Sequence, residues 1–113
     1  MTITERKDDG ICIIALSGEL DIGTSDDARD RLLAAVDAGE RSLAVDFREV
    51  DYISSSGLRI FILVLKKLNS LNGRLVLFGV QEKVAQVFRL AGFSRLFSIL
   101  ENEEEAVATL KKA

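Results

Sequence analysis

Six consecutive apolar residues, Ile11 to Leu16 (ICIIAL), follow a turn signal at Asp8-Asp9-Gly10 near the start of the chain. The run is too short for a typical helix, and three of its six residues are isoleucine, which favours strands. No polar residue alternates with the apolar ones. The run therefore predicts a strand that is buried on both faces, as in the middle of a sheet covered by helices.

Further short apolar runs alternate with segments whose apolar residues recur at helical spacing. We expect strands over 2–6, 11–16, 43–47, 75–78 and 96–100, and helices over 24–38, 54–71, 81–91 and from 102 onward. Thr24 or Ser25 is expected to cap the first of these helices. The alternation predicts an α/β fold in which a mixed, mostly parallel sheet packs against about four helices. No linker, repeat or low-complexity segment interrupts the chain, so residues 1–113 are expected to form a single domain.

The residue types that the chain lacks exclude several kinds of site. It contains no histidine and one cysteine, Cys12. The usual general base and the Ser-His-Asp and Cys-His arrangements are therefore excluded. One cysteine cannot form an internal disulfide or a thiolate zinc site. We expect no catalytic residue and no metal ligand, and we expect Cys12 to be a small core residue.

Charge and hydropathy argue against a nucleic-acid or membrane partner. The chain carries 15 Lys and Arg against 18 Asp and Glu, a net charge of −3, whereas nucleic-acid binding requires a basic excess on one face. Neither of the two longest apolar runs, Ile11 to Leu16 and Ile60 to Leu65, approaches the roughly 18 residues of a membrane span. The N-terminal MTITERKDDG lacks the apolar core of a signal peptide. We expect a cytoplasmic protein in a reducing compartment, without membrane insertion.

Three consecutive serines, Ser54 to Ser56, precede Gly57 at the start of the longest predicted helix. One serine is enough to cap a helix, a contribution of about 1 kcal/mol, and a glycine inside a helix costs up to about 1 kcal/mol relative to alanine. A P-loop would need more glycine and an adjacent lysine, and a nucleophile elbow would need Gly-x-Ser-x-Gly. Two interpretations stay open: a helix cap, or a serine that accepts a phosphate from another protein.

A set of short motifs lies along the chain: Gly18-Glu19-Leu20-Asp21, Asp46-Phe47, Ser54-Ser55-Ser56-Gly57-Leu58-Arg59, Val84, Val87-Phe88, Gly92-Phe93 and Phe97. In these motifs the chain resembles the STAS domain family, and specifically the free-standing anti-sigma factor antagonists of bacteria. These pieces occur in the expected order over nearly the whole chain. The resemblance implies one STAS domain over residues 1–113.

The resemblance also implies a partner switch controlled by phosphorylation. The family motif is typically Asp-Ser-Ser/Thr-Gly, and the serine after the aspartate is phosphorylated. Aligning the glycine with Gly57 makes Ser55 the acceptor, with Ser56 as the flanking hydroxyl. Ser54 replaces the family aspartate, so Ser54 and Ser56 remain alternative acceptors. Asp21 matches a family aspartate that contributes to partner binding, although it is also interpretable as an ordinary loop or cap carboxylate.

The predicted long helix offers a second candidate surface. Its apolar positions on one face are expected to be core, namely Leu58, Phe61, Ile62, Leu65 and Leu68, with Ile60 and Val64 widening the stripe. Leu63 projects on the opposite side, near Arg59. We hypothesise a docking patch of Leu63, Ile60 and Arg59 beside the serines; the alternative is a single exposed leucine, which is common. The partner-binding candidates are Asp21, Ser54, Ser56, Gly57, Arg59, Ile60 and Leu63.

A phosphate adds roughly −1.5 to −2 charges at its serine. If Asp21, Asp46 and Asp51 lie near the acceptor, the modified site is expected to be strongly negative. A loss of only ~3 kcal/mol would weaken a complex more than 100-fold, which is enough to exchange partners.

The leading hypothesis is a regulatory protein that is not an enzyme. Unphosphorylated, it would bind an anti-sigma factor with serine kinase activity and so release a sigma factor. The kinase would supply ATP and Mg²⁺, phosphorylate Ser55 and dissociate, and a serine phosphatase would reset the system. The domain itself is expected to hold no cofactor. The alternative is a STAS scaffold subunit of a signalling or transport assembly, and an enzyme or nucleotide-binding domain is disfavoured by the missing histidine and glycine-rich loop.

Overall fold

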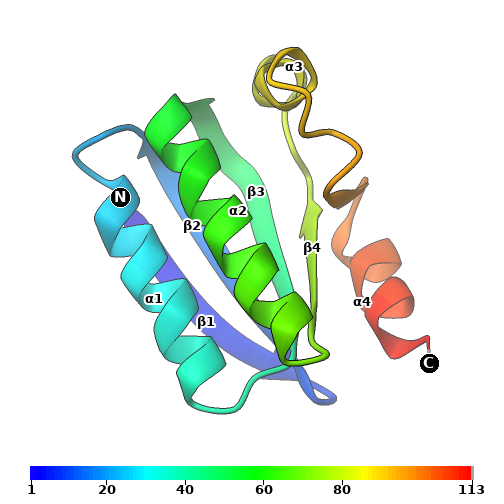
Figure 1. Ribbon diagram of the computed structural model, residues 1–113. Helices are drawn as coiled ribbons and strands as arrows, with labels where there is room; N and C mark the ends of the chain where they lie inside the picture. The colour runs from blue at the N-terminus through cyan, green and yellow to red at the C-terminus, as the bar shows by residue number, and fades with distance from the viewer. Residues whose placement is uncertain (113) are drawn as a thin grey trace.

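The computed structural model describes residues 1–112, which form one five-stranded sheet and four helices (Figure 1). In chain order the elements are β1 (Thr2–Asp8), β2 (Ile11–Leu20), α1 (Ser25–Asp37), β3 (Ser42–Ile53), α2 (Ser55–Ser70), β4 (Arg74–Phe78), α3 (Glu82–Leu90), β5 (Ser98–Leu100) and α4 (Glu103–Lys111). The spatial order is β1-β2-β3-β4-β5; β1 is antiparallel to β2, and the other neighbours are parallel. The α/β fold with a mixed, mostly parallel sheet and four helices is confirmed.

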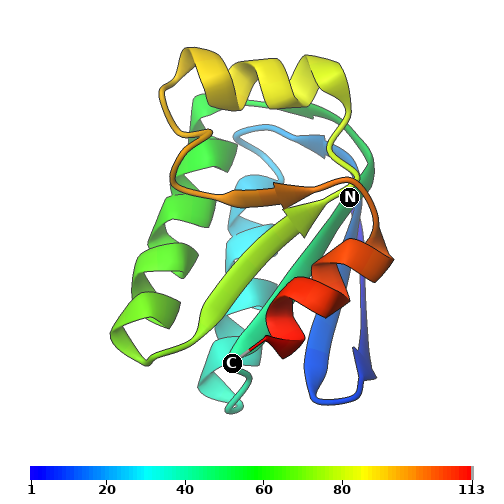
Figure 2. The same cartoon turned by 90° about the vertical axis from the view of Figure 1, so that its right-hand side faces the viewer.

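The sheet is covered on both faces, so its central strands are buried on both sides. Helices α1, α2 and α3 contribute to the larger core cluster on one face, and α4 packs on the other face, as Figure 2 shows. Alternate residues of β2 enter the two clusters: Cys12 and Ile14 enter the larger one, Ile11 and Ile13 the smaller one. The doubly buried strand predicted from the apolar run is confirmed, as is Cys12 as a core residue with 0% exposure.

Strands β2 and β3 are longer than the apolar runs that predicted them. Their parallel pairing continues to Leu20 opposite Ile53, with register shifts after Ala15 and after Gly18. The residues by which the strands extend beyond the apolar runs include several exposed polar side chains, Glu19 among them. The sequence of these extensions therefore lacks the apolar pattern of a buried strand. The extension matters because it brings the end of β2 beside the start of α2.

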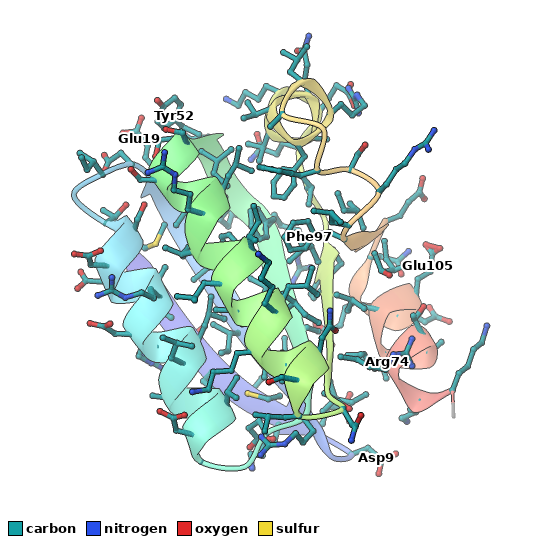
Figure 3. All side chains as sticks on the ribbon, viewed as in Figure 1. Asp9, Glu19, Tyr52, Arg74, Phe97 and Glu105 are labelled. Atoms are coloured by element: carbon teal, nitrogen blue, oxygen red, sulfur yellow. The ribbon has the colours of Figure 1, made fainter. Side chains whose placement is uncertain are left out.

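The last strand begins two residues later than expected. Leu96 and Phe97 precede β5, and Phe97 closes the core next to α3 (Figure 3). Its ring stands perpendicular to that of Phe88, with 5.5 Å between the ring centroids. The chain is thus held there by aromatic packing before it enters the ladder beside β4.

The carboxyl ends of parallel strands lie at the same end of the sheet. Here the parallel strands β2, β3 and β4 are followed by α1, α2 and α3, respectively. The N-terminal ends of α1, α2 and α3 therefore gather at the same end of the molecule, at the top of Figure 1. The serine run lies at this end. Within residues 1–112, no helix is long and apolar enough to cross a membrane.

Candidate docking site at the start of α2

Ser54 is the N-cap of α2. Its Oγ accepts a hydrogen bond of 3.2 Å from the backbone N–H of Gly57, and its own N–H donates to the carbonyl of Leu20 at 2.8 Å. The first bond satisfies a donor that the first turn of a helix leaves without a partner. The capping interpretation is therefore confirmed for Ser54, and its second bond ties the start of α2 to the end of β2.

The other two serines are not needed for the cap. Ser55 is the first residue of α2 and is exposed, whereas Ser54 and Ser56 are half-buried. Neither the Ser55 nor the Ser56 hydroxyl forms a hydrogen bond within residues 1–112, where Ser54 provides the cap. Ser55 is thus the serine of the run whose hydroxyl is both exposed and without a structural task.

Two of the residues proposed to bind a partner are buried. A Cβ on Gly57 would lie 2.8 Å from Cγ1 of Ile53 and 3.0 Å from the carbonyl oxygen of Leu20, so Gly57 lets α2 approach β2 and β3 closely. Ile60 is 6% exposed and belongs to the larger core, because α2 packs against α1 as well as against the sheet. The expectation that Gly57 and Ile60 offer surface to a partner is corrected: both serve the packing of α2.

The exposed side of α2 carries a row of three candidate residues. Ser55, Arg59 and Leu63 follow one another at intervals of four, which places them on one face of the helix. All three are exposed, Leu63 by 47%, so its predicted projection into solvent is confirmed. Ile62 and Leu65, expected in the core, are half-buried at its margin.

This face of α2 is positively charged although the chain as a whole is acidic. The sequence of α2 contains no Asp or Glu, and its charged residues are Arg59, Lys66 and Lys67. Lys67 pairs with Asp37 of α1 at 3.5 Å, whereas Arg59 and Lys66 form no ion pair within residues 1–112. The exposed row therefore joins a hydroxyl, a guanidinium and an apolar side chain.

Asp21 organises the loop between β2 and α1. Its Oδ1 accepts hydrogen bonds from the backbone N–H groups of Gly23 at 2.8 Å and Thr24 at 3.0 Å. Thr24 occupies the N-cap position of α1, but its side chain does not cap the helix, and the Ser25 hydroxyl donates to the carbonyl of Asp21. The expected cap by Thr24 or Ser25 is corrected to a loop built around Asp21. The Oδ2 of Asp21 forms no hydrogen bond within residues 1–112.

Two exposed apolar residues at this end were missed by the sequence reasoning. Ile22, next to Asp21 in the loop, is 82% exposed, and Tyr52, near the end of β3, is 49% exposed. Tyr52 lies opposite Glu19 of β2, and both stand beside the N-terminal end of α2 (Figure 3). The exposure of Ile22 could have been expected from the sequence, because this apolar residue stands between an aspartate and a glycine in a predicted loop. The sequence gives no signal for the exposure of Tyr52.

Asp46 is not part of this site. Its neighbours Val45 and Phe47 point into the larger core, so Asp46 faces the side of α4, where it is 7% exposed. Its carboxylate accepts from Arg48, with 2.7 Å between Oδ2 and Nη2, and this pairing raises the pKa of Arg48. The guanidinium lies 5.6 Å from the ring centre of Phe78.

The expected contribution of Asp46 to a negative patch at the serines is wrong, whereas Asp51 is exposed near the end of β3.

Comparison with known proteins gives matches over nearly the whole chain. A family model described as the STAS domain matches residues 2–106. BtrV of Bordetella bronchiseptica, named as a candidate anti-sigma factor antagonist, is 38% identical over 113 residues, which cover 100% of this chain and 97% of BtrV.

Solved structures share the fold. The crystal structure of a candidate anti-sigma factor antagonist from Thermotoga maritima matches with a TM-score of 0.92 and 22% identity, covering 97% of this chain and 95% of that one. SpoIIAA of Bacillus in its phosphorylated form matches with a TM-score of 0.75 and 21% identity, covering 97% of this chain and 100% of that one. The match to the family model and the identity to BtrV agree with this fold: the protein belongs to the STAS domain family.

Proposed function

We propose that the protein is an anti-sigma factor antagonist, and that phosphorylation of Ser55 by a serine kinase activity of the anti-sigma factor ends the complex. The observation that carries the proposal is the exposed Ser55 hydroxyl at the first position of α2, next to a cap that Ser54 already provides. A hydroxyl in this position can enter a kinase active site without unfolding the helix start.

The surroundings of Ser55 suit a protein partner. The exposed residues at this end and along α2 form what we term the α2 docking surface: Ile22, Tyr52, Ser55, Arg59 and Leu63. Tyrosine and arginine are enriched among the residues that contribute most to the binding energy of protein interfaces, and neighbouring apolar side chains add buried area around them. Ile22 is held on a loop that Asp21 organises, so little conformational entropy is lost when it is buried.

The relatives support the same assignment. BtrV, over the full length of this chain, is named as a candidate anti-sigma factor antagonist. SpoIIAA, which shares the fold, has been solved in a phosphorylated form, which agrees with a phosphate being accommodated on this fold. We extend both properties to this chain as part of the proposal.

The modification is a phosphoryl transfer from ATP bound to the partner. The Oγ of Ser55 attacks the γ-phosphorus, the bond from that phosphorus to the bridging oxygen breaks, and ADP leaves. The hydroxyl proton passes to a base of the kinase, because this chain has no histidine and the exposed row of α2 has no carboxylate. A phosphatase resets Ser55 by hydrolysis of the new bond with water. The domain itself acts as substrate and ligand, in the cytoplasm, without enzymatic activity or cofactor of its own.

The phosphate changes the docking surface more than the fold. It places about −1.5 to −2 charges at the N-terminal end of α2, where negative charge is favourable for the helix. Glu19, Asp21 and Asp51 stand at the same end of the sheet, so this end becomes strongly negative. A partner that packed against a neutral serine then meets repulsion and an added desolvation cost.

The test incubates the purified protein with the anti-sigma factor of its own organism, ATP and Mg²⁺, followed by peptide mass spectrometry. We expect one phosphate, assigned to Ser55 by fragmentation. Ser55→Ala is expected to abolish the transfer, and the matched controls Ser54→Ala and Ser56→Ala are expected to retain it. Absence of phosphate from residues 54–56, or undiminished transfer to Ser55→Ala, would overturn the assignment of the acceptor.

Binding measurements separate the proposal from the scaffold alternative. Ser55→Ala is expected to bind the anti-sigma factor as the wild type does, whereas Ser55→Asp is expected to bind at least about tenfold more weakly. Equal affinity of both variants would favour a STAS scaffold in which the serine turn is only structural.

A further inference from the structure

Ser55 and Arg59 are the first and fifth residues of α2. Residues four apart on a helix have side chains on the same face, with Cβ atoms about 5–6 Å apart. Both side chains are exposed, and Arg59 forms no ion pair within residues 1–112. A group added to the Ser55 oxygen therefore enters the space that the Arg59 guanidinium can reach.

Few other charges on α2 compete for this contact. The helix has no carboxylate that would hold Arg59. Lys67 pairs with Asp37, and Lys66 lies eleven residues beyond Ser55, about 16 Å along the helix axis. Near the ends of β2 and β3 the chain carries the acidic Glu19, Asp21 and Asp51, which repel a phosphate. The first turns of α1 and α3, at the same end of the sheet, add further carboxylates and, in α3, Lys83. Arg59 is the cation of α2 within reach.

From this arrangement we infer that Arg59 holds the phosphate of phosphorylated Ser55, so that the modification also removes a cation from the docking surface. The inference rests on the proposed function and deepens it. A guanidinium binds a phosphate through two parallel hydrogen bonds, and an anion placed four residues before a cation is the favourable order on a helix.

The consequence is a switch with two parts. In the unphosphorylated protein, Arg59 lies between Ser55 and Leu63 with its guanidinium available to an acidic group of the partner. In the phosphorylated protein, the guanidinium is occupied within its own chain. The partner then loses an ion pair in addition to meeting the negative charge of the phosphate.

The test uses the full chain with phosphoserine installed at position 55 during translation, so that no kinase is required. The second ionisation of the phosphate is followed by ³¹P NMR as a function of pH; for an unperturbed phosphoserine its pKa is about 6. A cation about 5 Å away in water lowers such a pKa by about half a pH unit. We expect Arg59→Gln to raise the midpoint by that amount. The matched control Lys66→Gln, which removes the same charge farther along α2, is expected to leave it unchanged.

Equal midpoints in Arg59→Gln and Lys66→Gln would overturn the inference. Both residues are exposed, so thermal unfolding of the unphosphorylated variants is expected to match the wild type, and this measurement confirms that the comparison concerns folded proteins. The titration is independent of the kinase assay. Failure of the titration would leave Ser55 as the acceptor, whereas failure of the kinase assay would leave the titration result intact.

Discussion

The backbone N–H of Ser54 donates a 2.8 Å hydrogen bond to the carbonyl oxygen of Leu20, which joins the start of α2 to the end of β2. A Cβ on Gly57 would lie 3.0 Å from the same oxygen. The carbonyl of Leu20 therefore sets both where α2 begins and how closely its first turn lies against the sheet. Ser55 is exposed at this helix start, whereas the residues on either side of it are half-buried.

Gly57→Ala is expected to destabilise the protein by about 1–3 kcal/mol. The added methyl group meets Cγ1 of Ile53 and the carbonyl of Leu20 at distances too short for a normal contact, and its relief requires α2 to shift. Urea denaturation measures the change. Gly23→Ala is the matched control, because a Cβ there lies at an ordinary 3.4 Å from Oδ1 of Asp21, and little change is expected. Wild-type stability of Gly57→Ala would show that α2 does not need this close approach.

Ser54→Ala is expected to cost about 1 kcal/mol of stability, since it removes the oxygen that caps Gly57. Ser55→Ala is expected to change the free energy of unfolding by less than about 0.5 kcal/mol, because the Ser55 hydroxyl forms no hydrogen bond within residues 1–112. The comparison of the two unfolding curves tests whether Ser54 caps the helix and whether the Ser55 hydroxyl contributes to stability. A larger loss of stability in Ser55→Ala than in Ser54→Ala would show that Ser54 is not the residue that caps the helix.

Much of the fold could be predicted because local patterns and tertiary packing agree. The run ending at Leu16 is apolar at every position, and the structure buries it on both faces. The extension of β2 to Leu20 could not be predicted, since Glu19 is polar and the register shifts there depend on the neighbouring strand. A strand that leaves the covered part of the sheet loses the apolar pattern by which it is recognised.

The candidate site could be predicted where the signal was a run of unusual residues, and not where it depended on tertiary neighbours. The cap by Ser54 and the projection of Leu63 follow from position along one helix. The burial of Ile60 depends on the packing of α1 beside α2, which helical spacing alone does not specify. The face on which Asp46 lies depends on which side of the sheet each helix covers. Ile22 is a single loop residue and belongs to no periodic pattern.

The stability of the protein is expected to fall at high pH because of Cys12. Burial raises the pKa of this thiol from 9.0 to about 12, with further contributions from Glu5 and Glu40. Above pH 9 the unfolded chain loses the thiol proton while the folded chain keeps it, so the stabilising contribution is present below the unfolded pKa and disappears as the pH rises toward the folded one. Between pH 9 and 10 the loss is about 1 kcal/mol.

Urea unfolding of the wild type and of Cys12→Ala across this pH range isolates the effect, because the other titrating groups are common to both. Cys12→Ala is expected to start from lower stability, since it leaves a small cavity, but to lose about 1 kcal/mol less between pH 9 and 10. Parallel pH dependence of the two proteins would show that the thiol ionises equally in the folded and unfolded states.

Leu63→Asp is expected to weaken binding of the anti-sigma factor at least about tenfold while leaving the thermal midpoint nearly intact. Leu63 is 47% exposed, so the substitution removes little packing from the free protein. It places a carboxylate at a position that the proposed complex would bury. Leu63→Ala separates the loss of apolar contact from the new charge, which could also pair with Arg59. Leu90→Asp is the matched control: Leu90 ends α3, is 80% exposed and lies outside the α2 docking surface, so its affinity is expected to equal that of the wild type. A similar loss from Leu90→Asp would move the contact away from α2, and a large fall in the melting temperature of Leu63→Asp would identify Leu63 as part of the core.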